Sequence, residues 1–139
     1  MEKKANNEDK IMWKVMIVDD EKLICKLVQA LVEWDKLGMQ MAAQAENAIQ
    51  ALDMLQQYRP DILITDIRMP GMDGLELIKN AKKICPELEI IIISGYAHFE
   101  YARNALSLGV GNYLLKPIKQ DELNETLRKI GERLDAKKS

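Results

Sequence analysis

The sequence predicts an α/β domain built around a doubly wound sheet of five parallel strands, because short apolar runs alternate with longer amphipathic segments. The expected strands cover residues 15–18, 39–45, 62–64, 89–93 and 113–115. The expected helices follow them, over residues 23–31, 48–55, 75–84, 99–108 and 123–134. Such alternation is typical of βα units, whose right-handed crossovers place helices on both faces of the sheet.

The expected strands are apolar on both faces. Residues 16–18, 62–64 and 90–93 show no alternation of polar and apolar side chains, which is typical of strands covered on both sides in a parallel sheet. The expected helices instead carry one apolar stripe each. In the first helix this stripe consists of Leu23, Leu27, Ala30 and Leu31. Five such units favour the flavodoxin-like strand order 2-1-3-4-5.

The composition indicates one globular domain. The chain has 139 residues, of which 47% are hydrophobic and 30% are charged, and a chain of this length buries roughly two-thirds of its unfolded surface. Its 20 basic and 22 acidic residues give a net charge of −2. This segment therefore lacks the positive field with which proteins bind a phosphate backbone, and we expect it to bind no nucleic acid.

A membrane span, secretion and a zinc site are not expected. The longest purely aliphatic run is residues 90–93, which is far too short to cross a bilayer. The N-terminus lacks the apolar stretch of a signal peptide, so we expect a cytoplasmic protein. Cys25 and Cys85 are far apart and His98 is the sole histidine, so we expect the cysteines to be small core residues rather than zinc ligands.

The chain is expected to consist of three segments. Residues 1–11 are polar and lack apolar periodicity, which predicts a flexible leader. The folded domain is expected to cover residues 12–134. Residues 135–139 are polar again and are interpreted as the start of a linker or tail.

Polar residues stand at the ends of four predicted strands. Parallel strands all end at one edge of a sheet, and ligands bind in the crevice outside those ends. In the expected order the first and third strands are neighbours about 4.8 Å apart, and the fourth lies on the other side of the third. We therefore expect three carboxylates, one hydroxyl and one ammonium to meet there: Asp19, Asp20, Asp66, Ser94 and Lys116.

The three carboxylates predict a magnesium site. Like charges this close repel each other strongly unless a cation lies among them, and carboxylate oxygens are the ligands that Mg²⁺ prefers. A carboxylate beside Mg²⁺ can attack a phosphoryl group while the metal, the lysine and the hydroxyl compensate the charge on the transferring oxygens. Asp66 is the central carboxylate, so it is the expected nucleophile.

Each of these residues also has a purely structural explanation. Asp20 could cap the first helix, Ser94 could simply end its strand, and Lys116 could be one more surface charge. These explanations do not account for an aspartate pair, an aspartate, a serine and a lysine at four strand ends that meet at one crevice. We therefore favour the site.

Four stretches of the sequence resemble the signature motifs of response-regulator receiver domains. They are residues 18–21, 61–74, 93–95 and 113–117. The resemblance extends from about residue 12 to residue 134.

This resemblance implies a role for each residue in a two-component phosphorelay. Asp66 would be the phosphoacceptor and would receive the group from a histidine kinase, with Mg²⁺ as cofactor. The metal ligands would be Asp19, Asp20, Asp66 and the backbone carbonyl of Arg68. Lys116 would pair with the phosphoryl group, and Ser94 would donate a hydrogen bond to it. Tyr113 would be the aromatic switch residue, and the peptide bond between Lys116 and Pro117 would be cis.

Two further stretches, residues 33–38 and 94–102, resemble receivers that are normally followed by an AraC-type helix-turn-helix domain. This implies a regulator of transcription whose output face consists of the fourth helix, the fifth strand and the fifth helix, with a homodimer possible on phosphorylation. The chain would then lack its DNA-binding output domain. The alternative is a stand-alone, single-domain response regulator.

Three other functions fit the residues less well. A phosphatase of the haloacid-dehalogenase type would carry Asp-x-Asp, whereas Arg68 stands at the second position, so turnover as an enzyme is not expected. A nucleotide-binding flavodoxin-like domain would need a glycine- or hydroxyl-rich loop after the first strand. The acids at residues 19–21 would instead repel phosphate. A degenerate receiver that only docks partners would normally have lost a site residue, and none is missing.

Overall fold

The computed structural model describes residues 12–67, 74–95, 104 and 110–138. The strands are β1 (Trp13–Val18), β2 (Met39–Ala45), β3 (Ile62–Asp66), β4 (Glu89–Ser94) and β5 (Asn112–Leu115). The helices are α2 (Lys22–Leu31), α3 (Trp34–Leu37), α4 (Ala48–Tyr58), α5 (Gly74–Ile84) and α7 (Gln120–Lys138). The expected leader, residues 1–11, and the helix expected over residues 99–108 lie outside the described residues, apart from Asn104.

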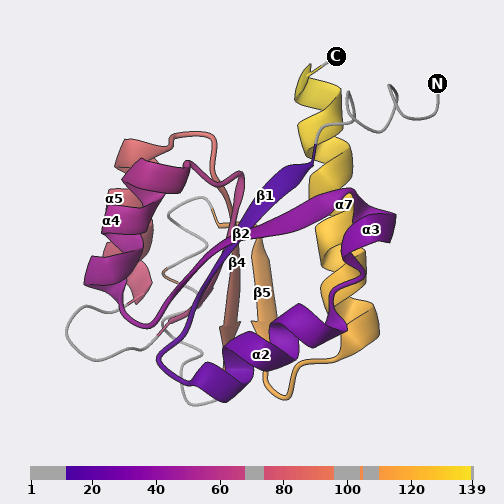
Figure 1. Cartoon of the computed structure of the whole chain (residues 1–139), viewed down its shortest axis with the longest axis horizontal. Helices are drawn as coiled ribbons and strands as arrows, with labels where there is room; N and C mark the ends of the chain where they lie inside the picture. Colours follow the sequence, from indigo (N-terminus) through magenta and orange to yellow (C-terminus); the bar gives the residue numbers. More distant parts are fainter. Residues whose placement is uncertain (1–11, 68–73, 96–103, 105–109, 139) are drawn as a thin grey trace.

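The strands form one parallel sheet in the order β2-β1-β3-β4-β5, which confirms the predicted order. Helices α4 and α5 cover one face of the sheet, and α2 and α7 cover the other (Figure 1). Alternate residues of β1 therefore enter different cores. Met16 packs with α4 and α5, whereas Ile17 packs with α2 and α7. Burial on both sides explains why the strand sequences are uninterrupted apolar runs.

The apolar stripe expected on the first helix is wrong except at Leu31, which packs against the core. Leu23 is 78% exposed and Leu27 is 39% exposed, whereas Cys25 and Val28 are fully buried. Helix α2 has apolar side chains at positions that fit two stripes of helical spacing, and the path of the chain out of β1 turns the stripe with Cys25 and Val28 toward the sheet. Leu23 and Leu27 of the other stripe are left at the surface. The pattern alone could not decide between them.

A break separates α2 from the short helix α3, which the sequence did not predict. Helix α3 ends at Gly38, whose φ of 67° is the left-handed conformation that glycine adopts without steric cost. The break is held from the far end of the chain. Asn124 of α7 accepts a hydrogen bond from the Glu33 N–H (2.8 Å) and donates one to the Leu31 carbonyl (2.8 Å).

Helix α7 continues to Lys138, beyond residue 134, where the apolar pattern stops. Its last turns are tied to β1, because the Trp13 indole N–H donates a hydrogen bond to Asp135 (2.9 Å). None of the helices in the described part of the chain combines the length and the apolar character needed to cross a membrane. Cys25 is buried, Cys85 is partly exposed, and both are free thiols.

Candidate functional site

The carboxyl ends of the strands bring the predicted residues to one edge of the sheet, the lower edge in Figure 1. The pairing of β1 with β3 sets Val18 beside Thr65, so the next residue of each strand, Asp19 and Asp66, also lie side by side. The pairing of β4 with β5 sets Ser94 beside Leu115. Lys116, the residue after Leu115, is therefore also placed at this edge of the sheet. The register of the parallel sheet thus assembles the site.

Three carboxylates form a compact acidic cluster at this edge. One oxygen from each of Asp19, Asp20 and Asp66 lies within 4.8 Å of the others. Asp19 and Asp66 are only 2% and 6% exposed, whereas Asp20 faces solvent. Two of the three charges are therefore largely removed from water. Their mutual repulsion is stronger in this less polar environment than it would be in water.

Backbone hydrogen bonds orient the two buried carboxylates. Asp19 Oδ1 accepts a hydrogen bond from the Glu21 N–H (2.9 Å), and Asp66 Oδ1 accepts one from the Ile67 N–H (2.6 Å). The Oδ2 atoms of both residues face the Lys116 ammonium, whose Nζ lies 3.2 Å from Asp66 and 3.8 Å from Asp19. The lysine therefore bridges the two buried acids.

The surroundings oppose the ionised form of Asp19. Burial raises the pKa of Asp19 to about 6, and the neighbouring carboxylates of Asp66 and Asp20 add to this, while the Glu21 N–H and Lys116 offset part of it. Burial alone would lower the pKa of Lys116, but the carboxylates, with Asp66 first, outweigh burial and raise it. Lys116 thus stays positively charged, and its single charge only partly balances the two buried carboxylates, Asp19 and Asp66.

These donors fit a hard divalent cation. Carboxylate oxygens from three residues converge within the reach of one ion, and Mg²⁺ is commonly held by one or two carboxylates together with water and phosphate oxygens. The exposed Asp20 leaves the solvent side open for those further ligands. Arg68, whose carbonyl the family resemblance adds to the ligands, lies outside the described residues.

The structural explanation of Asp20 is wrong. The residue at the N-terminal cap of α2 is Glu21, and its side chain makes no capping hydrogen bond. Asp20 instead joins the acidic cluster. The bond between Lys116 and Pro117 is cis, which confirms that prediction.

Ser94 and Tyr113 lie next to the cluster on β4 and β5. Ser94 is fully buried, and its carbonyl accepts a hydrogen bond from the Lys116 N–H (2.8 Å). The Tyr113 hydroxyl donates to the carbonyl of Gly95 (3.5 Å), and its ring packs against the core beneath α4 and α5. Tyr113 is thus joined to the residue that follows Ser94.

Glu21 also belongs to the surroundings of Lys116, a role that the sequence did not predict. Its Oε1 lies 3.7 Å from Lys116 Nζ, so the lysine has three acidic neighbours rather than two. Its position directly after the aspartate pair was the available signal, since it begins the helix that starts at the edge of the site.

Gly74, at the start of α5, lies very close to the backbone of Asp66 and Ile67. A Cβ atom at this position would lie 2.6 Å from the Asp66 carbonyl oxygen and 2.7 Å from the Ile67 Cα. Both contacts are to backbone, which cannot move aside as a side chain can. Gly71 and Asp73, which precede Gly74 in the chain, lie outside the described residues.

We expect Gly74→Ala to lower the free energy of unfolding by about 2 kcal/mol, because the methyl group must displace the backbone of β3. Urea unfolding followed by circular dichroism measures this change. Gly111→Ala is the matched control, since a Cβ there meets nothing within 4 Å. Equal stability of the two variants would show that the close contact at Gly74 is unimportant.

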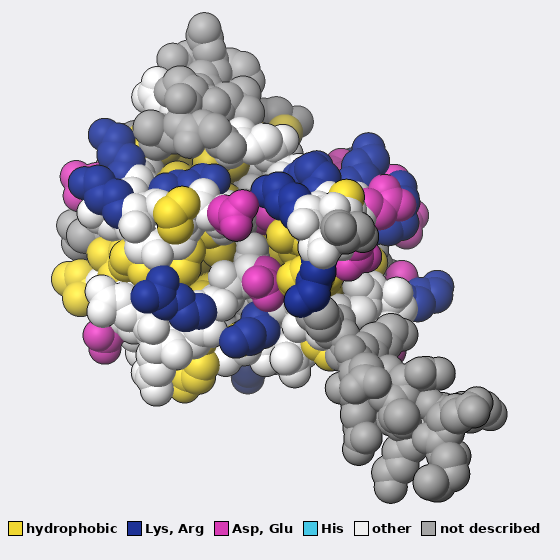
Figure 2. All heavy atoms as spheres, turned by 90° about the horizontal axis from the view of Figure 1, so that it is seen from above, with side chains coloured by type: hydrophobic (Ala, Val, Ile, Leu, Met, Phe, Trp, Pro, Cys, Tyr) yellow, Lys and Arg dark blue, Asp and Glu magenta, His cyan; other side chains and the backbone are white. Residues whose placement is uncertain are grey.

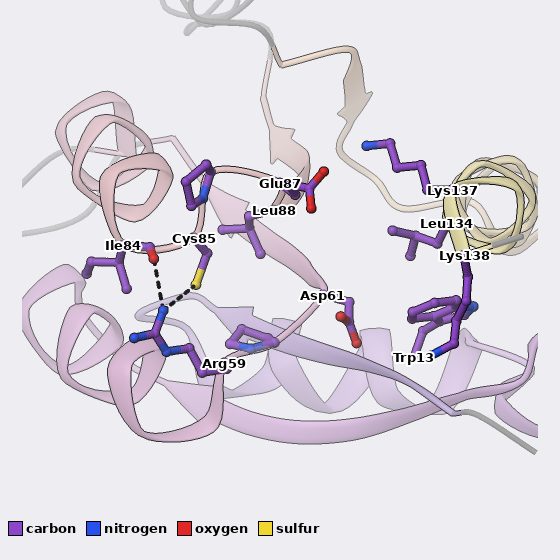
Figure 3. A pocket seen from close by; sticks show the side chains of 12 residues that line it. Trp13, Arg59, Asp61, Ile84, Cys85, Glu87, Leu88, Leu134, Lys137 and Lys138 are labelled. Atoms are coloured by element: carbon purple, nitrogen blue, oxygen red, sulfur yellow. Dashed lines mark hydrogen bonds between the residues drawn. The ribbon is translucent and has the colours of Figure 1, made fainter. Parts of the chain in front are cut away.

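A groove of about 420 Å³ lies at the opposite edge of the sheet. Figure 2 shows this edge from above, with lysine and arginine side chains around an apolar area. In Figure 3, Arg59 donates a hydrogen bond to the Ile84 carbonyl (2.9 Å) at the end of α5, across the groove from Lys137. The groove shares no residue with the acidic cluster. Because Arg59 donates to a carbonyl at the end of α5, it is best explained as a cap on that helix.

Comparison with known sequences identifies relatives among regulators of transcription. The uncharacterized transcriptional regulatory protein YesN of Bacillus subtilis is 40% identical over 119 residues, which are 86% of this chain and 32% of YesN. The transcriptional regulatory protein HptR of Staphylococcus aureus is 33% identical over 119 residues, which are 86% of this chain and 46% of HptR. The chain thus spans about a third to a half of the length of these relatives.

Solved structures and a family model also identify this chain as similar to response regulators. The REC domain of the response regulator AraT from Geobacillus stearothermophilus superposes with a TM-score of 0.89 at 38% identity, covering 93% of this chain and all of that one. The two component transcriptional regulator AraC from Clostridium phytofermentans gives 0.84 at 33% identity, covering 91% and 98%. The model of the response regulator receiver domain matches residues 15–128. With this match over most of its length, the chain belongs to the response regulator receiver domain family.

Proposed function

We propose that Asp66 accepts a phosphoryl group from a sensor histidine kinase, with Mg²⁺ held by Asp19, Asp20, Asp66 and the backbone carbonyl of Arg68. The observation that carries this proposal is the position of the Asp66 Oδ2 atom. It lies 3.2 Å from the Lys116 ammonium, and one oxygen of the same carboxylate lies within 4.8 Å of an oxygen from each of Asp19 and Asp20. The Asp66 carboxylate thus has both a nearby cation and further metal ligands around it.

The side chains divide the chemistry between them. Asp66 supplies the nucleophilic oxygen, and the Ile67 N–H on its Oδ1 holds the carboxylate in place. Lys116 supplies a fixed positive charge for the phosphoryl oxygens, and Ser94 a hydroxyl donor. When bound, Mg²⁺ would supply the positive charge that balances the aspartates and the transferring group. The protein is thus a phosphoacceptor and signalling domain, not an enzyme that turns over a separate substrate.

Incubation with acetyl phosphate tests this proposal. Intact-mass measurement should show a single phosphoryl adduct that is labile to hydroxylamine, as acyl phosphates are, and that forms only with Mg²⁺. The adduct should be absent in excess EDTA, because the acid cluster then repels the anionic donor. An adduct that forms equally well without a divalent cation would rule out the metal-assisted mechanism.

Signal transmission is proposed to run from Ser94 to Tyr113. The phosphoryl group on Asp66 offers strong acceptors, so the Ser94 hydroxyl moves toward it and the following residue, Gly95, moves with it. The hydrogen bond between Tyr113 and Gly95 couples this shift to the ring on β5. Packed interiors change between discrete arrangements, so the ring adopts a second position on the output face.

We expect Ser94→Ala and Tyr113→Ala to accept phosphate while losing most of the phosphorylation-dependent change in self-association. Sedimentation velocity with and without acetyl phosphate and Mg²⁺ measures this change. Tyr113→Phe is the control that separates the hydrogen bond from the ring. If both alanine variants respond like the wild type, the signal takes another route and Ser94 is only a phosphoryl ligand.

The output is proposed to be control of transcription in the cytoplasm, through a DNA-binding domain in a longer protein that forms a homodimer on phosphorylation. The printed names of YesN and HptR describe transcriptional regulatory proteins, and both are longer than this chain. A stand-alone receiver is the alternative. Gel-shift experiments on the corresponding full-length regulator should show phosphorylation-dependent DNA binding, whereas residues 12–138 alone should bind no DNA.

A further inference from the structure

Lys116 has an acidic neighbour that the proposed chemistry does not use. Its Nζ lies 3.2 Å from Asp66, 3.7 Å from Glu21 and 3.8 Å from Asp19. Glu21 differs from the other two because its side chain is 63% exposed and because it does not belong to the cluster of carboxylates that could bind a metal. It contacts the lysine from the solvent side.

The backbone of Glu21 is fixed while its carboxylate is not used by the helix. Its N–H donates to Asp19 Oδ1 (2.9 Å), and its carbonyl accepts from the Ile24 N–H (3.0 Å). It occupies the N-terminal cap of α2, where aspartate and serine stabilise a helix best. Its side chain makes no capping hydrogen bond. The helix therefore lacks a side-chain cap, and the carboxylate that could have served reaches Lys116 instead.

The contact between Glu21 and Lys116 affects the balance of charge at the site. When a divalent cation is bound, that ion and Lys116 together balance the three aspartates, so the Glu21 carboxylate is the surplus negative charge. A phosphoryl donor brings further negative charge and needs the Lys116 ammonium. We infer that Glu21 is a positioning residue that competes with the phosphoryl group for Lys116 and thereby slows phosphorylation of Asp66. This inference rests on the proposed function.

The step on which Glu21 acts is the transfer itself. An Asp66 carboxylate oxygen forms a bond to phosphorus while the bond between phosphorus and the donor oxygen breaks. With acetyl phosphate the electron pair leaves with acetate, and no proton needs to move. As the phosphoryl oxygens approach, the Lys116 ammonium must leave Glu21 to pair with them. The competition therefore affects the rate of transfer.

We expect Glu21→Gln to raise the rate of adduct formation from acetyl phosphate about fivefold, the effect of one exposed charge at contact distance. Intact-mass time courses at saturating Mg²⁺ measure this rate. Glu87→Gln is the control, because it removes the same charge from an exposed residue at the opposite edge of the sheet, and its rate should equal that of the wild type. The ratio of Glu21→Gln to wild type should fall toward one in ~1 M salt, which screens exposed charges. A ratio that is independent of salt would contradict an electrostatic role.

Glu21→Asp separates competition for Lys116 from a general effect of negative charge. The shorter side chain keeps the charge, but at a cap position it turns toward the helix N–H groups and away from the lysine. Competition predicts that Glu21→Asp is as fast as Glu21→Gln and melts at a higher temperature than wild type. A Glu21→Asp rate equal to that of the wild type would overturn the inference, as would no change in Glu21→Gln. If the wild type itself forms no adduct, the proposed function fails instead.

Discussion

Asp66→Asn is expected to abolish the phosphoryl adduct. The amide oxygen of asparagine can still accept the hydrogen bond from the Ile67 N–H that orients Oδ1, so the local backbone should be preserved. The side chain nevertheless loses its negative charge and its nucleophilic oxygen. Intact-mass measurement after incubation with acetyl phosphate and Mg²⁺ should show the unmodified mass only.

The control for this experiment is Asp53→Asn. Asp53 is exposed on α4, away from the site. Its substitution removes the same negative charge as Asp66→Asn does, so this variant should be labelled like the wild type. Labelling of Asp66→Asn to the wild-type extent would assign the phosphoryl group to a different residue and would remove the central element of the proposed function.

Asp19→Asn is expected to stabilise the metal-free protein at pH 7.5 by about 2 kcal/mol while weakening Mg²⁺ binding about tenfold or more. The amide oxygen can still accept the hydrogen bond from the Glu21 N–H, so the substitution removes chiefly a buried charge. Burial raises the pKa of Asp19 from 3.8 to about 6, which means that the folded protein holds its carboxylate at a cost in free energy. Urea unfolding in EDTA and titration calorimetry with Mg²⁺ measure the two effects.

The same pKa defines the pH dependence. Because the folded-state pKa is raised, the folded protein binds the proton more tightly than the unfolded chain does. The stabilising contribution of protonated Asp19 is complete below pH 3.8 and is lost as the pH rises through about 6. The stability advantage of Asp19→Asn should therefore shrink as the pH falls from 7.5 toward 4. An advantage that stays constant over this range would show that the Asp19 charge is not its source.

Much of the fold follows from local patterns. Uninterrupted apolar runs such as residues 62–64 predict strands buried on both faces, and five βα repeats limit the topology to a few orders. Because every strand of a parallel sheet ends at the same edge, the residues that follow the strands are neighbours whatever the details of packing. The convergence of Asp19, Asp66 and Lys116 was predictable for this reason.

Other features depend on contacts between segments that are distant in the sequence. The buried stripe of α2 is one, because Leu23 and Val28 belong to different helical faces that are both apolar. The break between α2 and α3 is another, because it is held by Asn124, more than ninety residues away from Leu31. A local pattern carries no information about a partner from the far end of the chain.

The sequence by itself determined the alternation of strands and helices, the edge at which the site lies and the acids that form it, because strand alternation and strand ends are properties of short segments. Only the tertiary structure decided which face of α2 is buried, how closely Gly74 lies under Asp66, and that Glu21 reaches Lys116. These features depend on the relative placement of whole elements, where a shift of a few ångströms makes or breaks a contact. The chemistry of the site was thus predictable from residue types at strand ends, whereas the balance of charge around Lys116 was set by packing.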